Sequence, residues 1–509
     1  MSYLIEALAS PRKFITSTLS KANTSRKPTE ANALCQLPQP PLKKFDASSL
    51  PQCVKTFFHD GKVPTKPDAQ AEIARFCLKN EQPLAMAWLF LRLEDIAPGK
   101  PQSLQLTHTS QVSRDQRLKT KDAVALAKWL GTWLGSLPLL TSVDVSKNLI
   151  GDKGVKAFAK LLSKNPPLQH LSINSAACSG RSITKLAKAL LLNTTLLSLD
   201  VSSNACENGV VFGDLLACNT TLQSLDLSNM RDLIDHEGRM RPVAEGLAKN
   251  MTLRHFGGAC LPMPMQMIEA IESNTTLTSI NLNAMMAPGF FTSPALLTAL
   301  CNHPLLKRIQ LYRCLLDGAG VDALQALVRK PGLEAIDVSY CDLSWATVKS
   351  ILDVLLVSPS MLEVDLSGNQ LTGRGEDIAA ILTHNEKLTS LKLADTKLSR
   401  DDLRAIRLAV NENENLLELD LSRNDHFTEK HARALQKRLL LNVRPTDAQR
   451  INAANALHML VTHKHDHKIP LELTTVITGF MALMGPDGVD SLDNLTATAG
   501  PLQSVPPSS

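Results

Sequence analysis

A leucine-spaced phrase recurs along the chain and constrains its fold more than any other feature. It reads LTSVDVSKN at Leu140–Asn148, TLLSLDVSSN at Thr195–Asn204, TLQSLDLSN at Thr221–Asn229 and LLELDLSRN at Leu416–Asn424. The first apolar residue of each LxxLxL copy falls at Leu140, Leu168, Leu196, Leu222, Leu253, Leu277, Leu306, Leu333, Met361, Leu388 and Leu416. These markers are on average 27.6 residues apart. A period of roughly 20–50 residues predicts a solenoid.

Each repeat contains two kinds of apolar spacing. LQSLDL (Leu222–Leu227) alternates with a period of two, which predicts a strand. GVKAFAKLLSKN (Gly154–Asn165) and DIAAILTHN (Asp377–Asn385) space their apolar residues by three and four, which predicts amphipathic helices. One strand and helix cannot bury their apolar faces alone, so the repeats must stack on one another.

Over residues 139–442 this pattern resembles leucine-rich repeat proteins of the ribonuclease-inhibitor type. The resemblance implies an α/β horseshoe solenoid, with a concave parallel sheet, outer helices and helical caps at both ends. In that family the ninth repeat position is Asn or Cys and bonds the loop backbone, here Asn148, Asn204, Cys314, Cys341, Asn369 and Asn424. Cys314 and Cys341 are therefore interpreted as structural. The loop geometry stays open at the departures Ala176, Met230, Leu261, Met285 and Thr396.

Asparagine also recurs three residues before the next marker, where each helix must end. The positions are Asn193, Asn219, Asn250, Asn274, Asn385 and Asn413. Asn tolerates the left-handed conformation that helix ends often adopt. We therefore expect these residues to end the helices in that conformation.

Composition shifts divide the chain into five segments. Residues 1–69 are basic and proline-rich and are expected to be largely disordered, and 70–138 should form a helical cap and a degenerate first repeat. Residues 139–442 hold eleven repeats, 443–485 a second helical cap, and 486–509 a disordered tail. LPQCVKTFF (Leu50–Phe58) is similar to the opening of an F-box, an adaptor module of ubiquitin ligases, but the rest of that pattern is missing.

Charge and motif content exclude several function classes. The chain has 54 Lys and Arg against 49 Asp and Glu, and the excess lies in residues 1–45, so the rest is neutral overall. A neutral body predicts no nucleic-acid binding. The apolar stretch Leu473–Gly485 is shorter than the roughly 20 residues that span a bilayer, so we expect no stable membrane insertion. Without a phosphate-binding loop, HExxH, GxSxG or CxxC motif, we predict no enzyme and no cofactor.

Two motifs leave alternatives open. HKHDHK (His463–Lys468) could bind zinc, but its flanking lysines favour a solvated linker, and we predict no metal site. Ran GTPase-activating proteins share this repeat type and place a catalytic arginine on a repeat loop. The loop Asp232–Leu247 offers Arg239 and Arg241, so a GTPase activator is the alternative function.

The amino-terminal residues suggest a biological setting. Residues 1–30 are basic, rich in Ser and Thr, and poor in acid, which is typical of a type III effector export signal, of an organelle transit peptide and of a plain disordered tail. We expect a cytoplasmic protein and, if it is an effector, one secreted into the host cell cytoplasm. A cytosolic sensor or adaptor of a eukaryotic cell is the third setting.

The variable strand positions predict where a partner binds. Asp144, Asp200, Asp226, Asp337, Asp365 and Asp420 form an acidic stripe at the fifth position, which is interrupted in the middle repeats. The candidate partner-binding residues of that region are Arg254, His255, Lys307, Arg308, Tyr312, Arg313 and Tyr340. Tyr and Arg dominate interface hot spots. Alternatively, each Arg pairs with the stripe, for example Arg313 with Asp337. We predict a monomer that binds a protein partner on this concave face.

Overall fold

The computed structural model describes residues 50–60, 62–64, 66–80, 82, 86, 89, 102–108, 117–134, 140–234, 237–283, 293–316, 318–440 and 442. The chain divides into two compact units, Met1–Leu343 and Ser344–Ser509. The predicted carboxyl-terminal cap, the disordered tail, the histidine cluster and residues 1–49 lie outside the described residues.

Short parallel strands follow chain order in both units. In the first unit, each strand pairs with the next: β1 Gln102–Gln105, β2 Leu140–Asp144, β3 His170–Ser172, β4 Ser198–Asp200, β5 Ser224–Asp226, β6 His255–Gly257, β7 Ser279–Asn281, β8 Arg308–Gln310 and β9 Ala335–Asp337. The second unit contains β10 Glu363–Asp365, β11 Ser390–Lys392 and β12 Glu418–Asp420, also paired in order. Their regular register puts equivalent repeat positions side by side.

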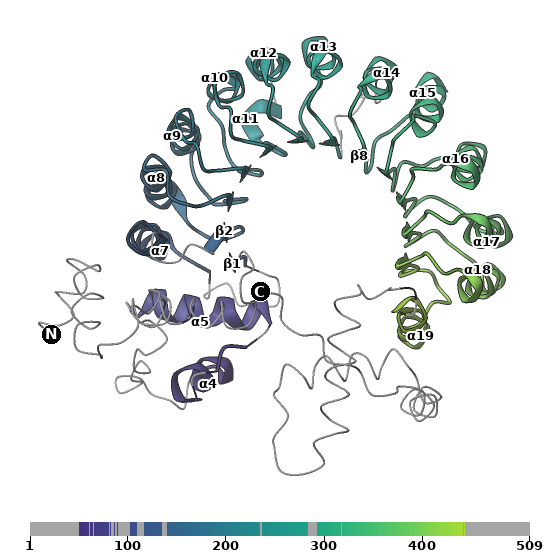
Figure 1. Ribbon diagram of the computed structural model, residues 1–509, viewed down its shortest axis with the longest axis horizontal. Coiled ribbons are helices and arrows are strands. Elements are labelled where there is room, and N and C mark those ends of the chain that lie inside the picture. Colours follow the sequence, from purple (N-terminus) through teal and green to yellow (C-terminus); the bar gives the residue numbers. More distant parts are fainter. Residues whose placement is uncertain are drawn as a thin grey trace, which may run out of the picture. The chain divides into compact units, whose positions relative to one another are not determined.

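Helices alternate with the strands. Those of the first unit are α4 Gln52–Asp60, α5 Pro67–Lys79, α7 Thr120–Trp133, α8 Gly151–Leu162, α9 Gly180–Leu190, α10 Val210–Cys218, α11 Arg231–Ile234, the 3-10 helix η4 Glu237–Arg239, α12 Arg241–Lys249, α13 Met265–Ser273, α14 Pro294–Asn302 and α15 Gly318–Val328. The second unit contains α16 Trp345–Val357, α17 Gly375–His384, α18 Arg400–Glu412 and α19 Glu429–Leu440. In each unit the strands line the inner side and the helices the outer side (Figure 1).

The core lies between the strands and the helices. Leu222, Leu225 and Leu227 are almost fully buried, as are Phe158 and Val155 on the inward side of α8. Burial of the alternating strand leucines against the amphipathic helices confirms the predicted α/β solenoid.

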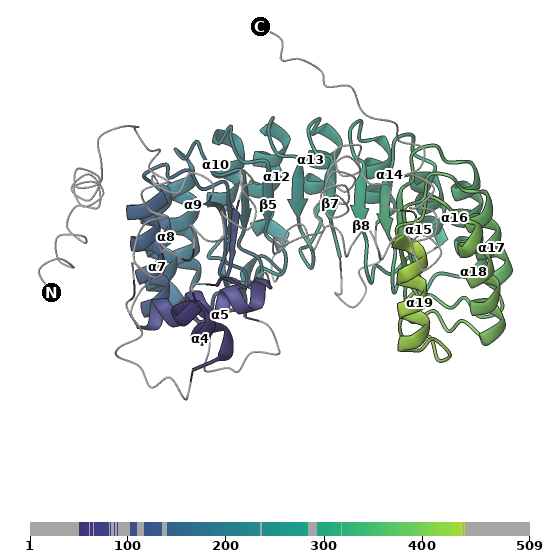
Figure 2. The same cartoon turned by 60° about the horizontal axis from the view of Figure 1, so that its bottom comes forward.

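Order begins earlier in the chain than predicted. The helix α4 lies within residues 1–69, for which little order was expected, and it buries Val54, Phe57 and Phe58. The ring of Phe58 packs edge-to-face on Phe76 of α5, with centroids 5.5 Å apart. Helix α5 in turn contacts α7 and β1 at the start of the array (Figure 2). Among the described helices, none is long and apolar enough to cross a bilayer.

The helix-ending asparagines are extended, so the predicted left-handed conformation is wrong. Asn219 has φ −80° and ψ 126°, and the helix-ending residues Asn250, Asn274, Asn385 and Asn413 are extended in the same way. The Asn219 Oδ1 accepts the N–H groups of Thr221 and Leu222 at 2.9 and 2.7 Å, while its Nδ2 donates to the carbonyls of Leu190 and Asn193 at 2.7 and 3.0 Å. Asn is required here because its amide both accepts and donates.

Candidate functional site

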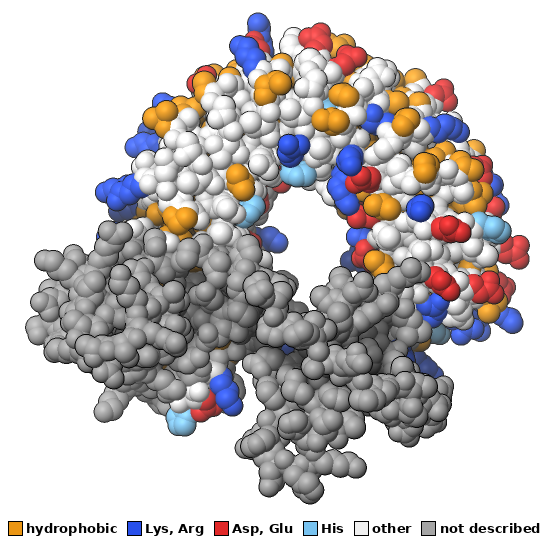
Figure 3. Space-filling model, viewed as in Figure 1, with side chains coloured by type: hydrophobic (Ala, Val, Ile, Leu, Met, Phe, Trp, Pro, Cys, Tyr) orange, Lys and Arg blue, Asp and Glu red, His pale blue; other side chains and the backbone are white. Residues whose placement is uncertain are grey.

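Positive side chains gather on strands β6 and β8. Figure 3 shows Lys, Arg and His side chains together on the inner edge of the first unit. The strand register places His255, Ser279 and Arg308 in one row, with the small serine in the middle. Burial lowers the pKa of His255, and the charges of Arg254 and Arg308 lower it further. These two guanidinium groups therefore act on one imidazole, which is held in its neutral form near pH 7.

Lys307 is adjacent to Arg308 in the sequence, but an ion pair offsets part of its positive charge. Its Nζ lies 2.6 Å from a carboxylate oxygen of Glu334, and its side chain is 51% exposed. An exposed ion pair of this kind contributes little to stability, but it does balance the positive charge locally. Lys307 therefore adds less positive charge to this row than its formal charge indicates.

Tyr312, Arg313 and Tyr340 form a second group, at the carboxyl ends of β8 and β9. The two tyrosine rings pack edge-to-face, with centroids 5.5 Å apart and an interplanar angle of 70°. The guanidinium carbon of Arg313 lies 5.1 Å from the Tyr312 centroid and 5.7 Å from the Tyr340 centroid. Arg313 is exposed and both tyrosines are half-buried. The arginine thus contacts aromatic rings, which is a favourable cation–π arrangement.

The eighth repeat position is left-handed in every repeat from β2 to β12 in which the structure describes that residue. The residues are Lys147, Ser175, Ser203, Asn229, Cys260, Arg313, Tyr340, Gly368, Asp395 and Arg423, with φ between 51° and 71°. Gly and Asn adopt this conformation readily, whereas bulky residues rarely do. Placing Arg313 and Tyr340 here costs roughly 1–2 kcal/mol each. Because the conformation recurs at this position along the array, it belongs to the repeat loop and does not by itself distinguish Arg313 and Tyr340.

Hydrogen bonds fix the loop that carries this group. The Tyr312 N–H donates to Asn283 Oδ1 at 2.9 Å. The Cys341 thiol donates to the Leu311 carbonyl at 3.0 Å, and the Cys314 thiol to the carbonyl of Leu282 in the preceding repeat at 3.5 Å. Burial raises the pKa of Cys341 to about 12, so the thiol stays protonated and unreactive. The structural role predicted for both cysteines is confirmed.

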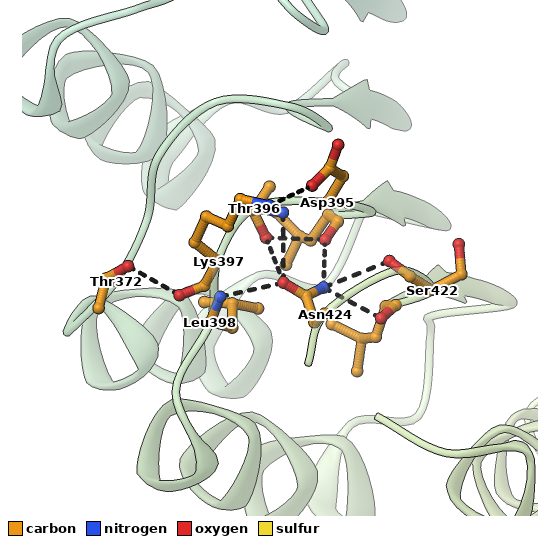
Figure 4. Close-up of polar contacts among 9 residues, drawn as sticks. Thr372, Asp395, Thr396, Lys397, Leu398, Ser422 and Asn424 are labelled. Atoms are coloured by element: carbon orange, nitrogen blue, oxygen red, sulfur yellow. Dashed lines mark hydrogen bonds and ion pairs between the residues drawn. The ribbon is translucent and has the colours of Figure 1, made fainter. Parts of the chain in front are cut away.

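Asparagine bonds the loop backbone at four other ninth positions, Asn148, Asn204, Asn369 and Asn424. Asn424 Nδ2 donates to the carbonyl of Leu421. Figure 4 shows that the amide also donates to the Ser422 carbonyl and accepts the N–H groups of Thr396 and Leu398. Thr396 is one of the departures left open by the sequence. Its Oγ1 donates to the Leu393 carbonyl at 2.8 Å, so threonine replaces asparagine as the loop donor.

The carboxylates of the acidic stripe form hydrogen bonds to the loops that follow their strands. Each of its carboxylates accepts the N–H of the serine two residues later, at 2.8–3.0 Å, in the pairs Asp144–Ser146, Asp200–Ser202, Asp226–Ser228, Asp337–Ser339, Asp365–Ser367 and Asp420–Ser422. The stripe is interrupted at Ser172 of β3 and again at Gly257 of β6, where a Cβ would lie 2.4 Å from the Asp226 carboxylate. The stripe therefore breaks at β6 because Asp226 fills the space beside that glycine.

The two arginines of the alternative function have partners within their own segment. Arg239 Nη1 donates to the Asp232 carbonyl at 2.7 Å. Arg241 lies at the start of α12 and pairs with Glu245 at 2.9 Å, with both side chains exposed. An arginine finger must reach a separate nucleotide, and Arg239 is tied back into its loop.

The predicted site thus forms two groups. Arg254, His255 and Arg308 act together on the strands, and the arginine–tyrosine group lies on the loops that follow β8 and β9. Lys307 instead pairs with Glu334. Sequence reasoning missed Asn283, which positions Tyr312; its place at the seventh position, beside Tyr312 of the next repeat, was the available signal.

Comparison with known proteins agrees with this architecture. A family model described as Leucine Rich repeat matches residues 136–159 and 357–375. The protein contains leucine-rich repeats. A 251-residue stretch is 26% identical to NACHT, LRR and PYD domains-containing protein 13 of Homo sapiens, and covers 41% of this chain and 23% of the human protein.

Solved structures with similar folds include two complexes. The yeast Rad7 and Elc1 complex contains a chain with a TM-score of 0.41 and 16% identity, over 69% of this chain and 91% of that one. The mouse RP105/MD-1 complex contains one with a TM-score of 0.30 and 19% identity, over 56% of this chain and 42% of that one.

Proposed function

We propose that this protein is a recognition scaffold that binds a partner protein through Arg308, Tyr312, Arg313 and Tyr340, with Arg254 and His255 alongside. Repeat solenoids use their extended inner surfaces for binding. The observation that supports the proposal most directly is exposed Arg313 lying over two half-buried tyrosine rings. Arg and Tyr are the residue types that most often dominate the binding energy of protein interfaces.

Two substitutions test the site without damaging the scaffold. Tyr312→Ser and Tyr340→Asn install residue types that other repeats carry at the same positions, serine at Ser202 and asparagine at Asn229. Asn is easier than Tyr in left-handed backbone, so the double variant should be at least as stable as the wild type. The experiment is affinity purification from cell lysate read by mass spectrometry, with circular dichroism melting in parallel.

A charge-reversed variant and a matched control complete the design. Arg308→Glu with Arg313→Glu should lose the same partner as the tyrosine variant, without a lower melting temperature. Arg423→Asn changes another exposed arginine at the left-handed eighth position, and this variant should still capture the partner protein. A partner that survives both site variants would refute the proposed surface.

The setting we favour is a bacterial effector that acts in the host cell cytoplasm, because residues 1–30 are basic, rich in Ser and Thr, and poor in acid. Fusion of residues 1–50 to a reporter enzyme tests this directly. Reporter activity inside host cells should depend on a working type III secretion system. A fusion that stays in the bacterium would rule out the export signal.

A further inference from the structure

A basic surface covers the outer side of three successive helices, α7 to α9. We name it the lysine face, and it consists of Lys121, Lys128, Lys153, Lys156, Lys160, Lys164, Arg181, Lys185 and Lys188, all exposed. Helix α8 packs between α7 and α9, so the three rows lie side by side. Figure 3 shows Lys and Arg side chains projecting outward along this part of the rim.

Little negative charge offsets the lysine face, although one of its nine cations, Arg181, pairs with Glu207 at 3.3 Å. These three helices contain two acidic residues, Asp122 and Asp152. Asp122 is buried and accepts the N–H of Lys119 at 2.8 Å. The Asp152 carboxylate accepts the Ser179 N–H at 2.7 Å and the Ser182 hydroxyl at 3.0 Å, so it is directed at the start of α9. By contrast, α10, α13 and α14 contain neither Lys nor Arg, so the charge is segregated along the array.

Apolar surface accompanies these charges. A shallow open groove between α7 and α8 is lined by Val124 and Ala125. Around them lie Thr120, Asp152 and the three lysines Lys121, Lys128 and Lys153. Lysine side chains can lay their hydrocarbon stems on such a surface while the ammonium groups reach outward. The groove therefore combines an apolar floor with a cationic edge.

Leu192 lies in the turn just after α9, which ends at Leu190. Arg181, Lys185 and Lys188 of α9 are spaced by four and three residues, which places these three cations along one stripe of the helix. Leu192 is 86% exposed, the largest exposure among the large apolar residues of the described part of the chain. A leucine gains nothing from a phosphate backbone in water, but it is stabilised where it enters the boundary between lipid headgroups and acyl chains.

We propose that the lysine face docks on an anionic membrane surface, with Leu192 entering the headgroup region. Clusters of four to eight or so lysines and arginines attract anionic lipids. Eight of the nine cations are lysines, which act as point charges, and among the described exposed residues of α7 to α9 none is an aromatic on which a nucleic-acid base could stack. Docking of this kind is peripheral and agrees with the absence of a spanning helix among the described residues.

Vesicle sedimentation with the full-length protein tests this proposal. Vesicles of phosphatidylcholine with about 30% phosphatidylserine should bind the protein at about 0.1 M salt, and pure phosphatidylcholine should not. Lys153→Glu/Lys160→Glu/Lys188→Glu should weaken binding about a hundredfold or more, since each cation near an anionic surface contributes a factor of about five. Leu192→Ser should weaken binding several-fold and leave its salt dependence unchanged.

The control triple Lys249→Glu/Arg404→Glu/Arg407→Glu makes the same change in net charge at exposed residues of α12 and α18 and should bind like the wild type. Equal loss in both triples would overturn the proposed location. Absence of wild-type binding to the anionic vesicles would overturn the proposal itself. Unchanged binding of the Leu192 variant, or tighter binding of a duplex DNA probe than of vesicles, would overturn the choice of a membrane as the partner.

Discussion

Replacement of Asn204 by alanine should destabilise the array by about 4 kcal/mol, since four buried hydrogen bonds are lost at about 1 kcal/mol each. Asn204 is 2% exposed. Its Nδ2 donates to the carbonyls of Ile173, Val201 and Ser202 at 2.8, 2.9 and 3.2 Å, and its Oδ1 accepts the Ala176 N–H at 2.9 Å. Asn204→Cys should cost about 3 kcal/mol, because a thiol at this position still donates to one loop carbonyl, as Cys341 does, and only three of the four hydrogen bonds are lost.

Urea unfolding followed by circular dichroism measures this difference, with fluorescence as a second probe because repeat arrays can lose cooperativity. Asn208→Ala is the matched control: Asn208 is exposed and accepts a single N–H, from Val210 at 3.1 Å, so its loss should cost less than about 1 kcal/mol. The decisive result is the order of the losses in the free energy of unfolding: largest for Asn204→Ala, smaller for Asn204→Cys and smallest for Asn208→Ala. A change of less than about 1 kcal/mol for Asn204→Ala would refute the structural role assigned to the ninth position.

Three further outcomes are expected. Gly257→Ala should lower the free energy of unfolding by about 1–3 kcal/mol in urea titrations, because the new Cβ displaces the Asp226 carboxylate; an unchanged midpoint would contradict this. His303→Asn should raise the free energy of unfolding by about 1 kcal/mol at pH 7, because His303 is fully buried and its Nε2 has no hydrogen-bond partner. The gain should be larger at pH 5. Burial lowers the pKa of His303, so the wild type loses stability as the pH falls below about 6.5, the ordinary histidine value, whereas the variant does not; parallel pH profiles would disprove this. Multiple-turnover GTP hydrolysis by a panel of small GTPases should be unchanged by the protein, and a stimulation abolished by Arg241→Ala would reinstate the alternative function.

The sequence predicted the repeated architecture because leucine spacing reports directly on which side chains are buried. Leu222, Leu225 and Leu227 had to share one face, and they do. The role of the helix-ending asparagines was harder to predict, since residue preference alone does not distinguish backbone tolerance from side-chain hydrogen bonding. Asn219 uses its amide in extended backbone, which becomes visible only when the carbonyls of the preceding repeat are in place.

The candidate site could be predicted in part. Arg254, Arg308 and Tyr312 were identified by residue type and repeat position, but the strain at Tyr340 depends on φ, which single-residue patterns do not encode. The lysine face was missed because net charge was summed over the whole chain. Its signal was present as lysines at helical spacing in three consecutive repeats, for example Lys160 and Lys188.

The ninth-position hydrogen bonds give the array a direction. Asn204 satisfies the carbonyl of Ile173 and the N–H of Ala176, both in the repeat before its own. Deleting a repeat from the carboxyl-terminal side therefore removes the asparagine that satisfies the N–H and carbonyl groups of the new last loop. Deleting one from the amino-terminal side instead leaves an asparagine amide without its loop partners, and water can solvate that amide. Truncation from the two ends should accordingly be unequal in its consequences, and a shortened version of the protein is best made by trimming repeats from its beginning.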